Sequence, residues 1–241
     1  MRQYIIQCAL HAQGDYKKTR KLIQSKVYLK PLKVTCKVVV IGDEDYPQGL
    51  YDLEEPPFVL FYKGNLDLLN NYECASVIGS RLPSQYALEA CELLVKVLRT
   101  RQTIVSGLAK GIDTCAHAFS LDFRSVAVLG CGIDVYYPRE NKDMQIILGQ
   151  DHCIISEFPP GCLPLKHHFP IRNRIIAALS HDLYVMAAQH RSGTMKTVEE
   201  AMRINRNVHC LPHSIFEDSG AGCNALIADG AGLITQYDIL K

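Results

Sequence analysis

From Ser76 onward the chain alternates short, continuously apolar runs with segments whose apolar residues recur at a helical period. The runs are rich in β-branched residues and read SVIG, TIVS, SVAVLG, CIIS, DLYVMAA and NVHCLP. Strands that are apolar throughout are typical of a parallel sheet covered by helices on both faces, and helices are the usual connections between such strands. The pattern therefore predicts an α/β fold with a doubly wound, mostly parallel sheet.

The N-terminal part of the chain has a different character. Up to Lys37 it is basic and helical in pattern, as in DYKKTRKLIQSK, whereas residues 43–57 are acidic and contain prolines. We therefore predict a small basic helical segment over residues 1–42, followed by the α/β domain over residues 43–241. The basic run is either a solvated face or a source of weak attraction for phosphates. Its cations are Lys17, Lys18, Arg20, Lys21, Lys26, Lys30, Lys33 and Lys37.

The overall composition limits the classes of partner. The 26 Lys and Arg are balanced by 25 Asp and Glu, so a nucleic-acid site requires a local cluster of cations. The ten cysteines form no C-x-x-C pair and we find no secretory leader, which indicates reduced thiols in a cytoplasmic protein. No apolar run approaches the roughly 18 residues that span a bilayer. We therefore expect no membrane partner.

A metal site was considered at VHCLPH, where His209, Cys210 and His213 crowd together. No second pair of ligands stands at a spacing typical of zinc sites. We expect a strand end followed by a proline turn at this point, and no bound metal.

Three of the apolar runs lead directly into glycine or serine, in VIGSR, VSGLAKGID and VLGCGID. The carboxyl ends of parallel strands meet at one edge of an open sheet, where glycines let backbone N–H groups approach an anion. We therefore expect these loops to line one anion-binding crevice, although each loop alone is equally consistent with a tight structural turn. The loops lack the G-K-[ST] ending of a nucleotide phosphate loop and the third glycine of a dinucleotide motif. No cofactor is expected.

The stretch HHFPIRNRIIAALS, residues 167–180, places two arginines beside an apolar run. Pro170 suits the start of a helix, and we expect Arg172 and Arg174 to flank its first turn. Positive charge at that end opposes the helix dipole, which suggests that an external anion compensates it. The alternative is that both arginines pair with carboxylates inside the fold, such as Glu157 or Asp134.

A second helix start follows the run DLYVMAA. In HRSGTMKTVEEA, Ser192, Gly193 and Thr194 stand between that strand and a predicted helix. Their hydroxyl and amide groups are suited to capping the helix, to holding a phosphate, or to both. For Thr194 we expect capping.

Seven motifs occur in an order that resembles one known family. They are VIGSR, SGLAKGID, AVLGCGIDVYYP, ISEFPPG, FPIRNRIIAALS, SGTMKT and GCNALIADGA. Together with the upstream YPQGLYDLEEPPFVLFYKGNLDLL, they make residues 44–235 similar to the DNA-processing protein A family, also called DprA/Smf. The resemblance implies a Rossmann-like domain that binds single-stranded DNA in a basic pocket, usually as a homodimer. It also implies protection of incoming DNA and loading of the recombinase RecA in natural transformation, without enzymatic turnover.

The resemblance also assigns residues to the DNA pocket. Its polar side chains are the arginine of the G-S-R motif, the three residues of R-N-R in F-P-x-R-N-R, and two lysines. They are Arg81, Lys110, Lys166, Arg172, Asn173 and Arg174. Hydroxyl groups and backbone amides would be offered to phosphates by Ser106, Gly107, Ser192, Gly193 and Thr194.

Two positions depart from the family pattern. Ala187, in VMAA, stands where the family commonly has an acid, so a hydrogen bond or an ion pair is lost there. Lys196, in SGTMKT, stands where a smaller or apolar residue is usual. Its ammonium group either adds a DNA contact or points to solvent.

Two other functions remain open from the sequence. Nucleotide phosphoribohydrolases of the lysine-decarboxylase-like type use a G-G-x-G-T-x-x-E loop, but here Thr197 stands at the glutamate position and the next acids are Glu199 and Glu200. That shift moves the carboxylate to another face of the helix, so no catalytic residue is assigned. In the other alternative, the basic N-terminus binds an acidic protein surface and the crevice stays unoccupied.

Overall fold

The computed structural model describes residues 1–239, and within them nine strands form one sheet. The strand order is β1-β2-β6-β5-β4-β3-β7-β8-β9. All neighbours from β6 to β9 are parallel, while β1 and β2 join one edge in antiparallel pairing. The strands are β1 (Lys37–Val40), β2 (Val59–Gly64), β3 (Cys74–Ile78), β4 (Thr103–Ser106), β5 (Ser125–Leu129), β6 (Cys153–Ser156), β7 (Asp182–Val185), β8 (Asn207–Cys210) and β9 (Gly232–Leu233).

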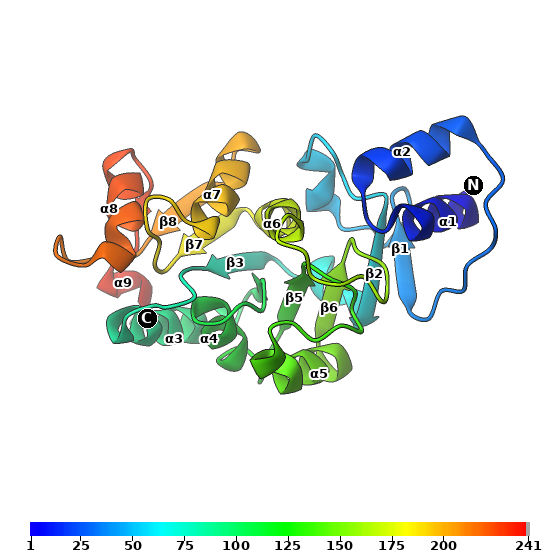
Figure 1. Cartoon of the computed structure of the whole chain (residues 1–241). Coiled ribbons are helices and arrows are strands. Elements are labelled where there is room, and N and C mark those ends of the chain that lie inside the picture. The colour runs from blue at the N-terminus through cyan, green and yellow to red at the C-terminus, as the bar shows by residue number, and fades with distance from the viewer. Residues whose placement is uncertain (240–241) are drawn as a thin grey trace.

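Helices cover both faces of this sheet. Figure 1 shows α6 and α7 on one side of the central strands and α3, α4 and α5 on the other. The helices are α1 (Arg2–Ala12), α2 (Tyr16–Ser25), α3 (Gln85–Leu98), α4 (Ile112–Ala118), α5 (Lys142–Asp151), α6 (His168–Ala178), α7 (Gly193–Arg203), α8 (Ala221–Ala228) and α9 (Gln236–Ile239). The predicted α/β fold with a doubly wound, Rossmann-like, mostly parallel sheet is therefore confirmed.

The strand order reverses next to β3. The chain builds β4, β5 and β6 outward on one side of β3, and then crosses over to place β7, β8 and β9 on the other side. In open α/β sheets the crevice outside the carboxyl ends of the strands at such a reversal is the usual ligand site. The topology therefore predicts a ligand site beside the loops that follow β3 and β7.

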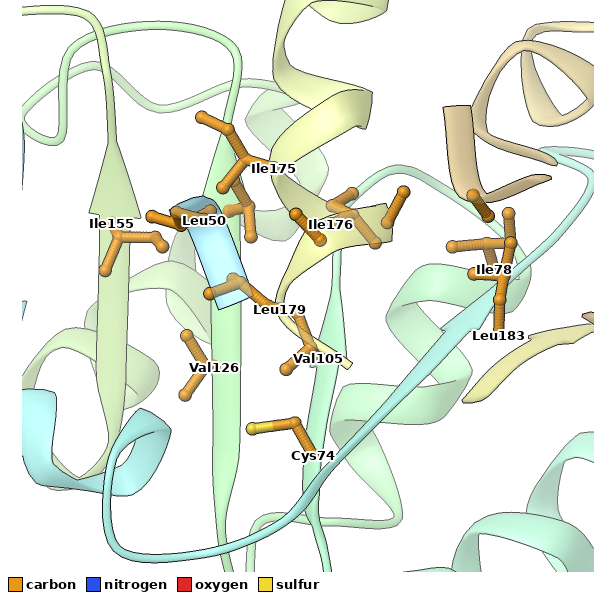
Figure 2. Packing of buried hydrophobic residues seen from close by; sticks show 14 of the residues in the cluster. Leu50, Cys74, Ile78, Val105, Val126, Ile155, Ile175, Ile176, Leu179 and Leu183 are labelled. Carbon is orange, nitrogen blue, oxygen red and sulfur yellow. The ribbon is translucent and has the colours of Figure 1, made fainter. Parts of the chain in front are cut away.

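A buried cluster fixes α6 over the middle of the sheet. Figure 2 shows Ile175 and Ile176 of α6 close to side chains of the strands below, among them Val105, Val126 and Ile155, all of which are buried. Burying each such side chain contributes about 1.5–3 kcal/mol. The carbonyl of Ile176 also accepts a hydrogen bond of 2.7 Å from the Ser76 hydroxyl of β3. The helix that carries the R-N-R motif is thus held in a fixed orientation.

The N-terminal helices pack at the β1–β2 edge of the sheet. Ile6 and Leu10 of α1 are buried in a cluster with Val59 and Phe61 of β2. Strand β1 belongs to the predicted N-terminal segment, residues 1–42, and yet it pairs with β2 in the sheet. The division into residues 1–42 and 43–241 remains a prediction.

Among residues 1–239, no helix is both long enough and apolar enough to cross a membrane. All ten cysteine thiols are free in the structure.

Candidate functional site

A crevice of about 870 Å³ opens at the reversal of strand order. Its walls come from the loop after β3, from the loop after β7 together with the first turns of α7, and from the beginning of α6. The position is the one that the topology predicts for a ligand site. Seven of the residues proposed from sequence line it, namely Arg81, Lys166, Arg172, Asn173, Ser192, Gly193 and Thr194.

Cations and aromatic rings meet at one wall of the crevice. The guanidinium carbon of Arg81, which is exposed, lies 5.7 Å from the centre of the Phe169 ring. The ring of Tyr137 lies 5.4 Å from the same ring, centre to centre, and Lys166 is part of the same lining. A guanidinium plane and an aromatic ring are both surfaces on which a nucleic-acid base stacks. This wall therefore offers positive charge and stacking surface together.

Arg172 lies in the floor of the crevice and is only 4% exposed. Its Nη1 atom donates a hydrogen bond of 2.7 Å to the carbonyl of Val128 at the end of β5. Burial lowers the pKa of Arg172, whereas the nearby carboxylate of Asp113 opposes that change. Burial also raises the pKa of Asp113, and the charge of Arg172 opposes this in turn. The floor of the crevice therefore holds one buried cation, Arg172, whose charge is balanced by one buried carboxylate, that of Asp113.

Gly107 makes room for that arrangement and does not itself line the crevice. A Cβ atom at Gly107 would overlap the guanidinium of Arg172 and would come within 2.6 Å of Asp113 Oδ2. The sequence had suggested that the amide of Gly107 contacts phosphates. Its structural role is instead to leave space beside β4 for the two charged side chains.

This role predicts a difference between two glycine substitutions. Gly107→Ala is expected to lower the free energy of unfolding by about 1–3 kcal/mol through overpacking, which corresponds to a fall in Tm of about 2–12 °C. Gly193→Ala is the matched control, because no atom lies within 4 Å of the Cβ position there. Thermal unfolding followed by circular dichroism measures both. Equal Tm values for the two variants would contradict the assignment.

The N-terminus of α7 forms the opposite wall. The N-cap is Ser192, whose hydroxyl accepts a hydrogen bond of 3.4 Å from the amide of Met195. The expectation that Thr194 caps this helix is therefore wrong, since the helix begins one residue earlier at Gly193. The side-chain amide of Asn173 donates a hydrogen bond of 3.2 Å to the Gly193 carbonyl and so links α6 to this wall.

Four residues of the crevice were not predicted as site residues. They are Phe169, Tyr137, His190 and Arg191, the last two in the loop after β7. The only sequence signal for Phe169 was its place directly ahead of Pro170 in the F-P-x-R-N-R motif. Lys196 of α7 brings a further exposed cation to the lining, and its contact with DNA remains a prediction.

Arg174 lies outside the crevice, contrary to the expectation from sequence. Its Nη2 atom lies 2.5 Å from Glu157 Oε2, and both side chains are nearly buried. Residues two apart on an α-helix are rotated by about 200° from each other, so Arg172 and Arg174 face opposite sides of α6. The alternative stated for this stretch, pairing with Glu157, holds for Arg174.

The helix dipole does not explain the positions of the two arginines, contrary to the expectation from sequence. Helix α6 begins at His168, so Arg172 and Arg174 lie in its second turn. The field of the helix terminus falls off within the first turn. The position of Arg172 is therefore explained by its contacts at the floor and not by compensation of the dipole.

Two further candidates have other partners. The Ser106 hydroxyl is buried and donates a hydrogen bond of 2.6 Å to the Val77 carbonyl. Lys110 Nζ lies 2.6 Å from Glu140 Oε1, and the pair is exposed beyond the lining of the crevice. Ser106 is the last residue of β4 and Lys110 lies in the loop after it. From this region, Ala109 of the loop and Asp113 of α4 line the crevice instead.

The third glycine loop supports the crevice without lining it. A Cβ atom at Gly130 would lie 2.9 Å from the Phe169 ring, so this glycine lets the ring sit against the end of β5. The amide of Gly132 bonds to the Cys162 carbonyl, and the amide of Gly161 bonds to Asp134 Oδ1. The loop therefore closes on the segment that leads to α6. The prediction that all three loops line one crevice was correct for two of them.

The structure thus defines a doubly wound α/β domain whose switch-point crevice is surrounded by cations, aromatic rings and a helix N-terminus. Comparison with known proteins narrows this class. The profile of the family described as DNA recombination-mediator protein A matches residues 37–241, and the chain belongs to that family. The family resemblance found from the motifs is thereby confirmed.

Individual relatives agree with this assignment. The DNA processing protein DprA of Streptococcus pneumoniae is 46% identical over 203 residues, which cover 83% of this chain and 72% of the relative. The protein of the same name from Bacillus subtilis is 37% identical over 199 residues, covering 81% and 67%.

Two solved structures are similar over most of their length. The X-ray structure of DprA from S. pneumoniae superposes with a TM-score of 0.83 at 37% identity, covering 100% of this chain and 92% of that one. The structure of DNA processing protein A from Helicobacter pylori, described for its single-stranded DNA binding mode, gives 0.75 at 29% identity, with 85% and 94% covered.

Proposed function

We propose that this chain binds single-stranded DNA in the switch-point crevice. The observation that carries the proposal is the wall where the Arg81 guanidinium lies over the Phe169 ring, 5.7 Å from its centre, above a floor occupied by Arg172. Proteins that bind single strands combine cations for the backbone with flat surfaces for the bases. The single-strand binding of the H. pylori relative supports the same ligand.

Each part of the crevice then has a role. Arg81 and Lys166 contact phosphates at the rim, and Arg172 supplies positive potential from the floor. The amides of Gly193 and Thr194 at the start of α7 receive a phosphate oxygen next to the Ser192 cap. The hydrogen bond from the Asn173 side chain to the Gly193 carbonyl holds that wall against α6. Because backbone contacts carry no sequence information, we expect little preference for base sequence.

The biological role that we propose comes from family membership. The chain acts as a mediator of DNA recombination: it protects incoming single strands and helps load a RecA recombinase on them, as a homodimer in the cytoplasm. A binding role without turnover is part of this proposal, since Thr197 occupies the position at which nucleotide phosphoribohydrolases have their glutamate. Glu199, which also lines the crevice, stands two residues further along α7.

Fluorescence anisotropy tests the proposal directly. A labelled oligo-dT is titrated with the protein, and unlabelled single strand and duplex of equal length compete for binding. We expect the single strand to displace the probe and the duplex to do so weakly, because bases in a duplex are not available to stack on Phe169. Release of free base from a nucleoside monophosphate, or equal competition by duplex, would contradict the proposal.

A further inference from the structure

The first helical unit carries a concentrated positive charge that the crevice does not use. Residues 15–33 hold seven of the 26 Lys and Arg of the chain but only one of its 25 Asp and Glu. We call the exposed cations of this stretch the N-terminal basic surface. They are Lys17, Lys18, Arg20, Lys21, Lys26, Lys30 and Lys33.

Most of these charges have no acidic partner. Within the part of the chain that the structure describes, only Lys18 lies within 4.0 Å of a carboxylate, that of Asp15, which also accepts the first amide bond of α2. Unpaired like charges repel one another in the folded protein, and binding a polyanion removes that repulsion. The surface is thus an uncompensated source of positive potential.

The backbone that carries the basic surface is held in place by α1. The Tyr4 hydroxyl donates hydrogen bonds of 3.0 Å to the carbonyls of Leu22 and Val27. Gln7 bonds to both the amide and the carbonyl of Leu32, and His11 Nε2 lies 2.8 Å from the Lys30 carbonyl. Little further ordering of the backbone is needed on binding, which favours affinity.

An exposed aromatic ring lies among the cations. Tyr28, between Lys26 and Lys30, is 87% exposed, and Val27 and Leu32 beside it are also exposed. A ring interleaved with lysines is the combination that stacks bases while it neutralises phosphates. A helix that binds a membrane surface instead presents an apolar face, whereas Leu22 and Ile23 of α2 are partly covered and its exposed positions are mostly charged. A single strand fits this surface better than a lipid surface does.

The basic surface and the crevice are connected through the segment that precedes α6. The turn between α1 and α2 touches that segment, where a Cβ atom at Gly14 would lie 2.6 Å from the Phe158 ring. Phe158 stacks on His168 at 4.0 Å, and Lys166 of the crevice rim lies two residues before His168. Figure 1 shows α6 between α7 on one side and the α1–α2 unit on the other.

We propose that the N-terminal basic surface is a second binding surface for the phosphate backbone of the same single strand that occupies the crevice. The inference rests on the proposed function for its first contact, because the strand leaves the crevice past Lys166. Short strands use the crevice alone. Longer strands also bind the basic surface, and each cation engaged there adds to the salt dependence of binding.

A matched pair of triple variants tests the proposal in the full chain. The first is Lys17→Gln, Arg20→Gln and Lys21→Gln, all exposed positions of α2. The control, Lys96→Gln, Arg101→Gln and Arg203→Gln, removes the same charge from exposed positions that do not line the crevice. Both are titrated with oligo-dT of about 6 nucleotides and of about 40 nucleotides across a salt series, since one crevice-sized site takes about 4–16 nucleotides.

We expect the α2 variant to bind the short oligonucleotide like the wild type and the long one about tenfold more weakly at low salt. The slope of log K against log salt for the long strand should become shallower by about 2, because each phosphate contact on a single strand contributes about 0.7. The control should keep the wild-type slope for both strands. Equal loss in both variants would show a net-charge effect and overturn the proposal.

Other outcomes separate this proposal from the proposed function. If the wild type binds only the long strand and the α2 variant loses it, the basic surface is supported and the crevice assignment fails. If the wild type binds both strands and the α2 variant binds both with wild-type affinity and salt slope, only the second surface is refuted. Loss of binding to phosphatidylglycerol vesicles with unchanged DNA binding would overturn the proposal in favour of a membrane surface.

Discussion

Arg81→Ala is expected to weaken the binding of a short oligo-dT by about 10- to 150-fold, because hydrogen bonds to a charged group contribute about 1.5–3 kcal/mol. The melting temperature should stay unchanged. Arg81 is exposed, and its guanidinium lies over the ring of Phe169. Removing the guanidinium therefore costs the folded protein little, while the bound strand loses a phosphate contact and a stacking surface. Anisotropy titrations and thermal unfolding measure the two quantities.

Two companion variants make the Arg81 result specific. Arg81→Lys keeps the charge but lacks the planar fork that holds two phosphate oxygens and stacks on a ring, so an intermediate affinity is expected. Lys110→Ala removes an exposed cation of a neighbouring loop that pairs with Glu140 outside the crevice, and its affinity should match that of the wild type. A Lys110 variant that is weakened as much as the Arg81 variant would mean that the strand follows a different path.

Glu157→Ala is expected to lower the free energy of unfolding by about 3–5 kcal/mol, because it leaves the buried guanidinium of Arg174 without its partner. For a chain of this size that corresponds to a fall in Tm of about 6–20 °C. The two side chains are 6% and 12% exposed, and their closest atoms are 2.5 Å apart. Burial raises the pKa of Glu157 and the charge of Arg174 opposes the rise, so the pair is electrostatically coupled.

Replacing both partners tests whether the stability of the fold depends on the ion pair itself or only on the absence of an unpaired buried charge. The double variant Glu157→Leu with Arg174→Met should recover most of the lost stability, because apolar residues of similar volume often replace a buried ion pair without cost. Below its unfolding temperature, Glu157→Ala should bind oligo-dT with nearly the wild-type affinity, since neither residue lines the crevice. An unchanged Tm together with lost DNA affinity would contradict this account and would indicate that Arg174 is part of the DNA site.

The fold was the most predictable part of the molecule. Six apolar runs from Ser76 onward correspond to β3 through β8, because strands buried on both faces leave a strong pattern in the sequence. The two antiparallel strands, β1 at the edge of the sheet and β2 beside it, were not predicted. They lie in the basic segment and beyond the acidic entry, where tertiary pairing decides the structure and local composition does not.

The location of the candidate site could be predicted from the sequence, but the residues that line it could be predicted only in part. The carboxyl edge of the sheet follows from the strand–loop motifs, and two residues of the R-N-R motif, Arg172 and Asn173, line the crevice. Which arginine faces the crevice depends on the rotation of α6, and a residue spacing of two should have separated Arg172 from Arg174. Phe169 was missed because an apolar ring beside a proline looks like a core residue until the neighbouring loops are placed.

The salt dependence of short oligo-dT binding, measured for the wild type and for Arg81→Ala, tests the central claim most directly. Four exposed cations line the crevice, namely Arg81, Lys166, Arg191 and Lys196. If all four neutralise phosphates, the slope of log K against log salt approaches about −2.8, and Arg81→Ala makes it shallower by about 0.7. A flat salt dependence, or a slope that the substitution leaves unchanged, would contradict binding of single-stranded DNA in the crevice.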